Sequence, residues 1–262
     1  MVSTTSYAYE PLQKSHDEVR LLRISPTEKK DHAALYTCEI AVFDLDSAPA
    51  YIALSYAWGG TSRPIPLRIA QDGLLSIGQN LHDFFCHFAT NKYNKKHRPW
   101  VWVDQVSIDQ TNVLERNHQV QLMSRIYIQS CLVLMWLGTD ALKPLLENAY
   151  FSRLWIVQEV LLAHDLRVVC GPIWIHADSI RYACVRAAPG QLPAACNLFL
   201  DAARTDKWWR LKACIDRYSR NECSDPRDTV YGLLGLMQER ERPQVDYSKS
   251  VYEVFTDAVE ML

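Results

Sequence analysis

The sequence has no long apolar run and no strong excess of charge of either sign. Its longest apolar stretches, such as residues 131–137, are far shorter than the roughly 20 residues that a helix needs to cross a bilayer, so we expect no membrane span. The net charge of −2 over 262 residues gives no electrostatic footprint for nucleic acid or for an acidic membrane. The N-terminus lacks a basic start followed by an apolar core, so we predict no secretory signal and expect a cytoplasmic protein.

The sequence also lacks any cysteine motif. Its eight cysteines are scattered, without a C-x-x-C pair or the Cys/His spacing of a zinc knuckle, and several fall inside apolar strands. We therefore expect reduced thiols in the core of an intracellular protein rather than a disulfide framework. His82, Cys86 and His87 share one predicted helix, but no further ligand cluster accompanies them, so we predict no metal site.

The composition is that of an ordinary globular protein, with 48% hydrophobic and 22% charged residues. There are no internal repeats and no low-complexity tract. We expect a loose N-terminal segment over residues 1–18, an α/β core with N-terminal strands over 19–175, and a helical part of the same domain over 176–262. The last predicted helix has no stop signal, so we expect that helical part to be truncated.

Short apolar runs bounded by turn residues predict strands, and helical stripes separate them. The predicted strands cover residues 19–24, 35–43, 51–60, 100–104, 131–137 and 166–170, with a hairpin over 64–77. Helices are predicted from Asn80, over 115–129, around 140–149 and over 151–160. This alternation predicts a mostly parallel sheet flanked by helices, whose ligands bind at the carboxyl ends of the strands.

One carboxylate in the predicted helix FSRLWIVQEV is unusual. Glu159 lies four residues after Trp155, so both side chains share a face, while apolar residues surround the rest of the helix. A buried carboxylate is costly unless it is paired, hydrogen-bonded or protonated. Glu159 is therefore either the partner of an arginine such as Arg153, Arg125 or Arg167, or part of a site.

Five blocks of sequence together resemble the fungal heterokaryon incompatibility (HET) domain family. They are ALSYAWGG, VWVDQVSIDQ with the ERNHQV that follows, MSRIYIQSCLVLMWLG, RLWIVQEV and DPRDTVYGLLGL. The resemblance runs in order from about residue 50 to the C-terminus. One departure is that only residues 139–152 lie between the WLG and RLWIVQEV blocks, where the family has a longer insert.

The resemblance implies a role in fungal non-self recognition and regulated cell death. HET domains are thought to be similar to TIR domains, which implies a flavodoxin-like sheet and, on that analogy, Glu159 as a catalytic carboxylate that cleaves NAD at the nicotinamide glycosidic bond. NAD or a related nucleotide would be a substrate rather than a cofactor. The implied partners are further copies of the chain on activation and an upstream sensor protein. The alternative is a non-enzymatic signalling module that triggers cell death by assembling with partners.

Residues of the expected rim could bind such a nucleotide. Aromatic side chains could stack on a base, the two glycines would allow close approach of a diphosphate, and an arginine could pair with it. The candidate binding residues are Ser55, Tyr56, Trp58, Gly59, Gly60, Arg63, Asp104, Arg116 and Trp155.

Each of these residues also has a structural interpretation. The two glycines could simply form a turn, because the sequence contains neither G-x-G-x-x-G nor a Walker lysine pattern. Ser55 lacks a nucleophile elbow, and no His and Asp have the spacing of a triad. Asp104 could position a loop through backbone amides. Residues 109–115 could start a helix, and residues 225–228 could form a turn in which Arg227 ties elements together.

Overall fold

Four parallel strands form the centre of the sheet. A computed structural model describes residues 6–26, 36–59, 64–69, 73–139, 145–186, 194–203 and 209–261. In chain order the central strands are β3 (Tyr51–Tyr56), β6 (Trp100–Trp102), β7 (Leu132–Trp136) and β8 (Leu166–Cys170). Their spatial order is β6-β3-β7-β8, the arrangement of flavodoxin-like sheets. The strand order therefore reverses between β3 and β7, where such sheets bind ligands.

The outer strands add antiparallel pairings on both sides of this parallel centre. On one side, β1 (Glu18–Pro26) runs antiparallel to β6 and to β2 (Tyr36–Asp44), and β2 meets the hairpin of β4 (Ile65–Ile69) and β5 (Gly73–Ile77). On the other side, β9 (Ile173–His176) runs antiparallel to β8. The expected α/β class and N-terminal strands are confirmed. The predicted hairpin turn at residues 71–72 lies outside the described residues.

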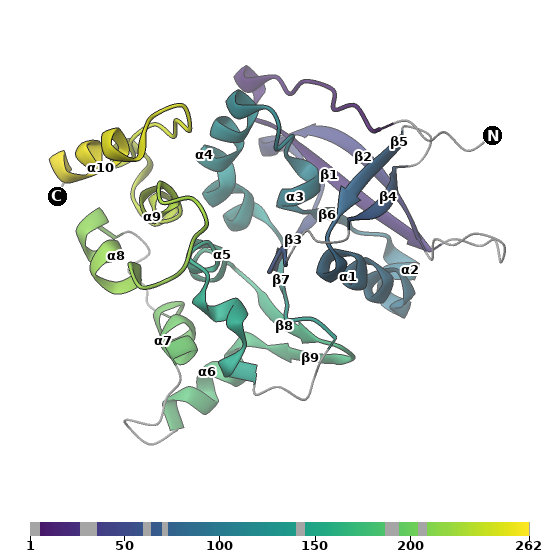
Figure 1. The fold of residues 1–262 in the computed structure, drawn as a ribbon. Coiled ribbons are helices and arrows are strands. Elements are labelled where there is room, and N and C mark those ends of the chain that lie inside the picture. The colour runs from purple at the N-terminus through teal and green to yellow at the C-terminus, as the bar shows by residue number, and fades with distance from the viewer. Residues whose placement is uncertain are drawn as a thin grey trace.

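Helices cover both faces of the sheet (Figure 1). Helix α1 (Gln79–Thr90), followed by α2 (Lys92–His97), places Phe84 and Phe85 in the same buried apolar cluster as Ile52 and Leu54 of β3. On the opposite face, α4 (Val113–Gln129) and α5 (Ile156–Leu161) bury apolar side chains against residues such as Ala53. Alternate residues of a strand point to opposite faces, so the apolar run of β3 serves both layers.

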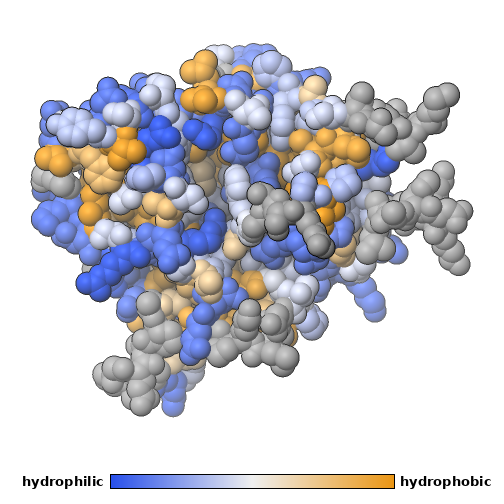
Figure 2. Space-filling view, in the orientation of Figure 1, coloured by the Kyte–Doolittle hydropathy of each residue, from blue (hydrophilic) through white to orange (hydrophobic). Residues whose placement is uncertain are grey.

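The C-terminal part is helical, as expected. It contains α6 (Ala177–Arg186), α7 (Ala194–Asp201), α8 (Leu211–Tyr218), α9 (Asp228–Tyr231) and α10 (Val251–Glu260). Figure 1 shows these helices beside α5 and α4, away from the N-terminal strands. Apolar side chains remain at the surface over α10 (Figure 2), where Val259 is 66% exposed. In the described part of the chain, no helix is long and apolar enough to span a bilayer.

Two local predictions were wrong. Gly78, not Asn80, caps α1, because the Asn80 side chain is used elsewhere: it donates to the carbonyl of Ala57 at 2.7 Å and accepts from Trp136 Nε1 at 2.9 Å. The helix predicted over 151–160 is shorter, since Ala149–Ser152 forms a 3-10 turn and α5 starts at Ile156. The helix expected around 140–149 falls partly on residues 140–144, which lie outside the described residues.

Candidate functional site

A pocket of about 680 Å³ lies at the carboxyl rim of the parallel strands. The loop after β3, the start of the four-residue helix α3 (Asp104–Ser107), α4, the segment before α5 and residues 222–247 supply its walls. Pockets of this size take small molecules, and the position matches the binding region of flavodoxin-like sheets. The polar and aromatic lining residues include Trp58, Asp104, Gln110, Arg116, Arg153, Trp155, Glu222, Asp225, Asp228 and Tyr247.

Trp58 and Asp104 join two of the strand ends. The indole Nε1 of Trp58 donates to Asp104 Oδ2 at 2.8 Å, and Asp104 Oδ1 accepts the backbone N–H of Gln105 at 2.7 Å. Burial raises the pKa of Asp104 above its ordinary value, and the hydrogen bond from Trp58 acts in the opposite direction. Asp104 thus lines the pocket and also accepts a backbone N–H of its own loop, as the structural interpretation predicted; its contact with a ligand stays a prediction.

Trp155 lies on the opposite wall, where Asp228 holds it. Asp228 accepts from Trp155 Nε1 at 3.1 Å and from the hydroxyl of Tyr247 at 2.6 Å. The DPRD motif was predicted only as a turn, and neither Asp228 nor Tyr247 was predicted as a pocket residue. The turn itself is confirmed, since Arg227 pairs with Asp225 at 2.6 Å and donates to the carbonyl of Tyr247, also at 2.6 Å.

Two guanidinium groups line the pocket. Arg116 Cζ lies 4.0 Å from the centre of the Tyr247 ring, and its buried Nε has no hydrogen-bond partner. Arg153 donates to the backbone carbonyl of Tyr56. Arginine forks match the oxygens of phosphates and carboxylates, so these two cations could hold an anionic ligand.

Glu159 lies behind this pocket and does not line it. Its side chain is 2% exposed and accepts a hydrogen bond from Ser55, whose hydroxyl also bonds the hydroxyl of Tyr150. Burial raises the pKa of Glu159 to about 7, although the charge of Arg153 and the hydrogen bond from Ser55 oppose this rise. Near neutral pH the carboxyl therefore exists in both protonation states.

No described arginine forms an ion pair with Glu159. Arg125 pairs instead with Asp17 and Asp46, and Arg167 pairs with Asp165. Arg153 acts on Glu159 through its charge, while its hydrogen bond goes to the carbonyl of Tyr56. Glu159 therefore neither pairs with a described arginine nor lines the pocket. It is buried and bonded to the Ser55 hydroxyl, which in turn bonds the Tyr150 hydroxyl.

The candidate binding residues divide into three groups. Trp58, Gly59, Asp104, Arg116 and Trp155 line the pocket. Ser55 and Tyr56 are buried at the end of β3, where the Tyr56 hydroxyl donates to Gln105 Oε1 at 2.9 Å. Gly60 and Arg63 lie outside the described residues.

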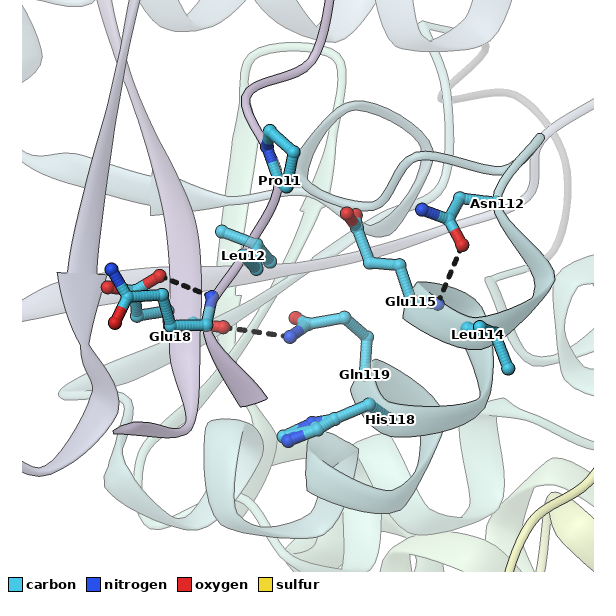
Figure 3. Close-up of a pocket in the computed structure, with 9 residues that line it drawn as sticks. Pro11, Leu12, Glu18, Asn112, Leu114, Glu115, His118 and Gln119 are labelled. Carbon is cyan, nitrogen blue, oxygen red and sulfur yellow. Dashed lines mark hydrogen bonds between the residues drawn. The ribbon is translucent and has the colours of Figure 1, made fainter. Parts of the chain in front are cut away.

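A second, smaller pocket of about 160 Å³ lies between the N-terminal segment and α4 (Figure 3). Asn112 caps α4 by accepting the N–H of Glu115 at 3.1 Å, so this region does start a helix. Glu115 has a further role, since it is 6% exposed and pairs with the buried Arg20 at 2.6 Å. Within the described part of the chain, no group of three or more acidic, histidine or cysteine side chains could hold a metal.

Comparison with known proteins gives two matches. The family model described as Heterokaryon incompatibility protein (HET) matches residues 51–144. Heterokaryon incompatibility protein 6, OR allele, from Neurospora crassa is 32% identical over 145 residues, which cover 51% of this chain and 20% of that protein. The chain thus spans about a fifth of its curated relative. No solved structure matches the chain significantly.

Proposed function

We propose that this chain, whose residues 51–144 match the heterokaryon incompatibility family model, is a member of that family and acts in fungal non-self recognition and regulated cell death. The Neurospora relative is a heterokaryon incompatibility protein by name, which supports the part of the proposal that concerns non-self recognition. The partners in this proposal are further copies of the chain and an upstream sensor protein that brings them together in the cytoplasm. The pocket is already formed in a single copy, and in this proposal assembly of several copies controls its activity.

The proposed activity is cleavage of NAD at the nicotinamide glycosidic bond. The observation that carries it is the pocket of about 680 Å³ at the strand-order reversal, because it combines the groups that a dinucleotide needs. Trp58 and Trp155 offer aromatic faces for a base, and Arg116 and Arg153 offer cations for a diphosphate. Gly59, with a φ of +73°, lets the backbone approach closely.

Glu159 would act on the ribose. When the glycosidic bond breaks, its electron pair leaves with nicotinamide, and the ribose becomes an oxocarbenium-like cation that water captures to give ADP-ribose and a proton. A carboxylate beside that cation stabilises it. Glu159 does not line the pocket, whereas Arg153 does and acts on Glu159 through its charge. In this proposal Arg153 leaves the Tyr56 carbonyl and turns toward the diphosphate, and this movement opens Glu159 to the pocket.

The test is nicotinamide release by the protein fused to an inducible dimeriser. We expect release on forced self-association, and a drop of about 100-fold or more in Glu159→Gln, since that change removes the negative charge. Glu260→Gln, at an exposed site on α10, is the matched control and keeps full turnover. Equal turnover in wild type and Glu159→Gln, or none in either, would rule out the proposed chemistry.

The burial of Glu159 favours a second candidate, a signalling module without catalysis. A carboxyl group that is 2% exposed and bonded to Ser55 is also consistent with a purely structural role for Glu159. In that case Glu159→Gln, expressed in fungal cells within the full-length protein, still triggers cell death, whereas the enzymatic proposal requires that death is lost. Cell viability after induction, at matched protein levels, separates the two.

A further inference from the structure

Two cysteines of the C-terminal part face each other between α6 and α7. The sulfur of Cys184 on α6 lies 2.8 Å from the sulfur of Cys196 on α7, and the two residues are 12 positions apart in the chain. Both are buried, at 3% and 1% exposure, and both are free thiols in the structure. Other cysteines contact different groups: Cys131 reaches a backbone carbonyl, and Cys223 reaches a threonine hydroxyl.

We propose that Cys184 and Cys196 are an oxidation site at which a peroxide closes a disulfide that fastens α6 to α7. The sulfur atoms of a disulfide lie about 2.05 Å apart, so this pair needs to approach by less than about 1 Å. The helices already pack together, which means that the bond forms without a change of fold. Both cysteines are free core thiols in the structure, as expected from the sequence, and the proposal concerns what a peroxide does to them.

The reaction balances with one peroxide. A thiolate of the pair attacks a peroxide oxygen, the O–O bond breaks, and a sulfenic acid and hydroxide form. The second thiol then attacks the sulfenic sulfur and displaces its hydroxyl group, so that two thiols and one hydrogen peroxide give one disulfide and two waters. Burial and the neighbouring Cys184 raise the pKa of Cys196 to about 12, so little thiolate forms there and the reaction is slow.

The consequence of this bond follows from what α7 touches. Asp201 at the end of α7 pairs with Arg217 of α8 at 2.5 Å and accepts from the hydroxyl of Tyr218 at 2.7 Å. Phe199 of α7 packs on Phe151, next to Tyr150 of the hydroxyl network, with ring centres 5.8 Å apart. A disulfide between α6 and α7, together with the ion pair between α7 and α8, would link these three helices beside the segment that precedes α5.

The experiment treats the full chain with hydrogen peroxide or with a reductant, blocks free thiols, and digests it without reduction. We expect a cross-linked peptide pair joining Cys184 to Cys196, about 2 Da lighter than the two thiol peptides, and a melting temperature raised by roughly 4–10 °C that a reductant reverses. Cys214→Ser, at another buried cysteine, keeps the cross-link, whereas Cys184→Ser abolishes it.

Two outcomes would overturn the proposal. One is peroxide treatment that leaves both thiols free while the more accessible Cys131 is oxidised. The other is a cross-link that joins a different pair of cysteines. Peptide mapping of the wild type decides both points, so the proposal stays testable even if Cys184→Ser folds poorly.

Discussion

Replacing Glu159 by glutamine should change how stability depends on pH. Burial raises the pKa of this carboxyl from 4.5 to about 7 in the folded protein. A group with a higher pKa in the folded state keeps its proton there after the unfolded chain has lost it, so stability falls as pH rises through this range. Between about pH 5 and about pH 8, the loss is about 2.5 kcal/mol in the free energy of unfolding.

Glutamine cannot ionise, and its amide oxygen can still accept from Ser55. We therefore expect the stability of Glu159→Gln to rise relative to that of the wild type as pH rises. The difference in melting temperature between the two proteins should change in favour of Glu159→Gln by roughly 5–10 °C between about pH 5 and about pH 8. Thermal unfolding of both proteins over this range measures the gap, and Glu260→Gln controls for the change in net charge. A gap that stays constant with pH would refute a raised pKa at Glu159, whatever the protein's activity.

Two further predictions concern Arg20 and Arg116. Arg20→Met leaves Glu115 buried without its ion-pair partner and should lower the free energy of unfolding by about 3–5 kcal/mol. The double variant Arg20→Met, Glu115→Leu should regain part of this loss, because it removes the unpaired charge as well. Urea denaturation measures both variants, and a double variant less stable than Arg20→Met would contradict the ion-pair argument. Arg116→Met should weaken the binding of ADP-ribose by about 10–100-fold, and Arg116→Lys should have an affinity between those of the wild type and Arg116→Met. Calorimetry measures the affinity, and an unchanged affinity in Arg116→Met would exclude a contact between Arg116 and the diphosphate.

The central fold could be predicted from the sequence because its signal is local. Continuous apolar runs such as that of β3 indicate strands covered on both faces, and the helical stripe of α4 is visible in the spacing of Met123 and Tyr127. The order of the strands in the sheet could not be predicted in this way. The antiparallel pairing of β1 with β6 joins residues far apart in the chain, and no local pattern specifies it.

The site was predictable in part for the same reason. Trp58 and Asp104 were predicted because each lies near the end of a predicted strand, and the ends of parallel strands meet at one rim. Asp228 and Tyr247 were missed as pocket residues because they reach Trp155 through a packing of the C-terminal region that has no sequence pattern. The burial of Glu159 was predicted from its apolar neighbours, but its hydroxyl partners were not.

The pocket draws its two walls from separate lengths of the chain. The loop after β3 and α4 fall within residues 51–144, which the family model matches, whereas Trp155, Asp228 and Tyr247 lie beyond them. Strands β8 and β9 also lie beyond residue 144, so exchanging this C-terminal part between relatives would exchange one edge of the sheet together with Trp155, Asp228 and Tyr247. A chimera built at that boundary would inherit its ligand selectivity from both parents, and its fold would require the β7 of one parent to pair with the β8 of the other.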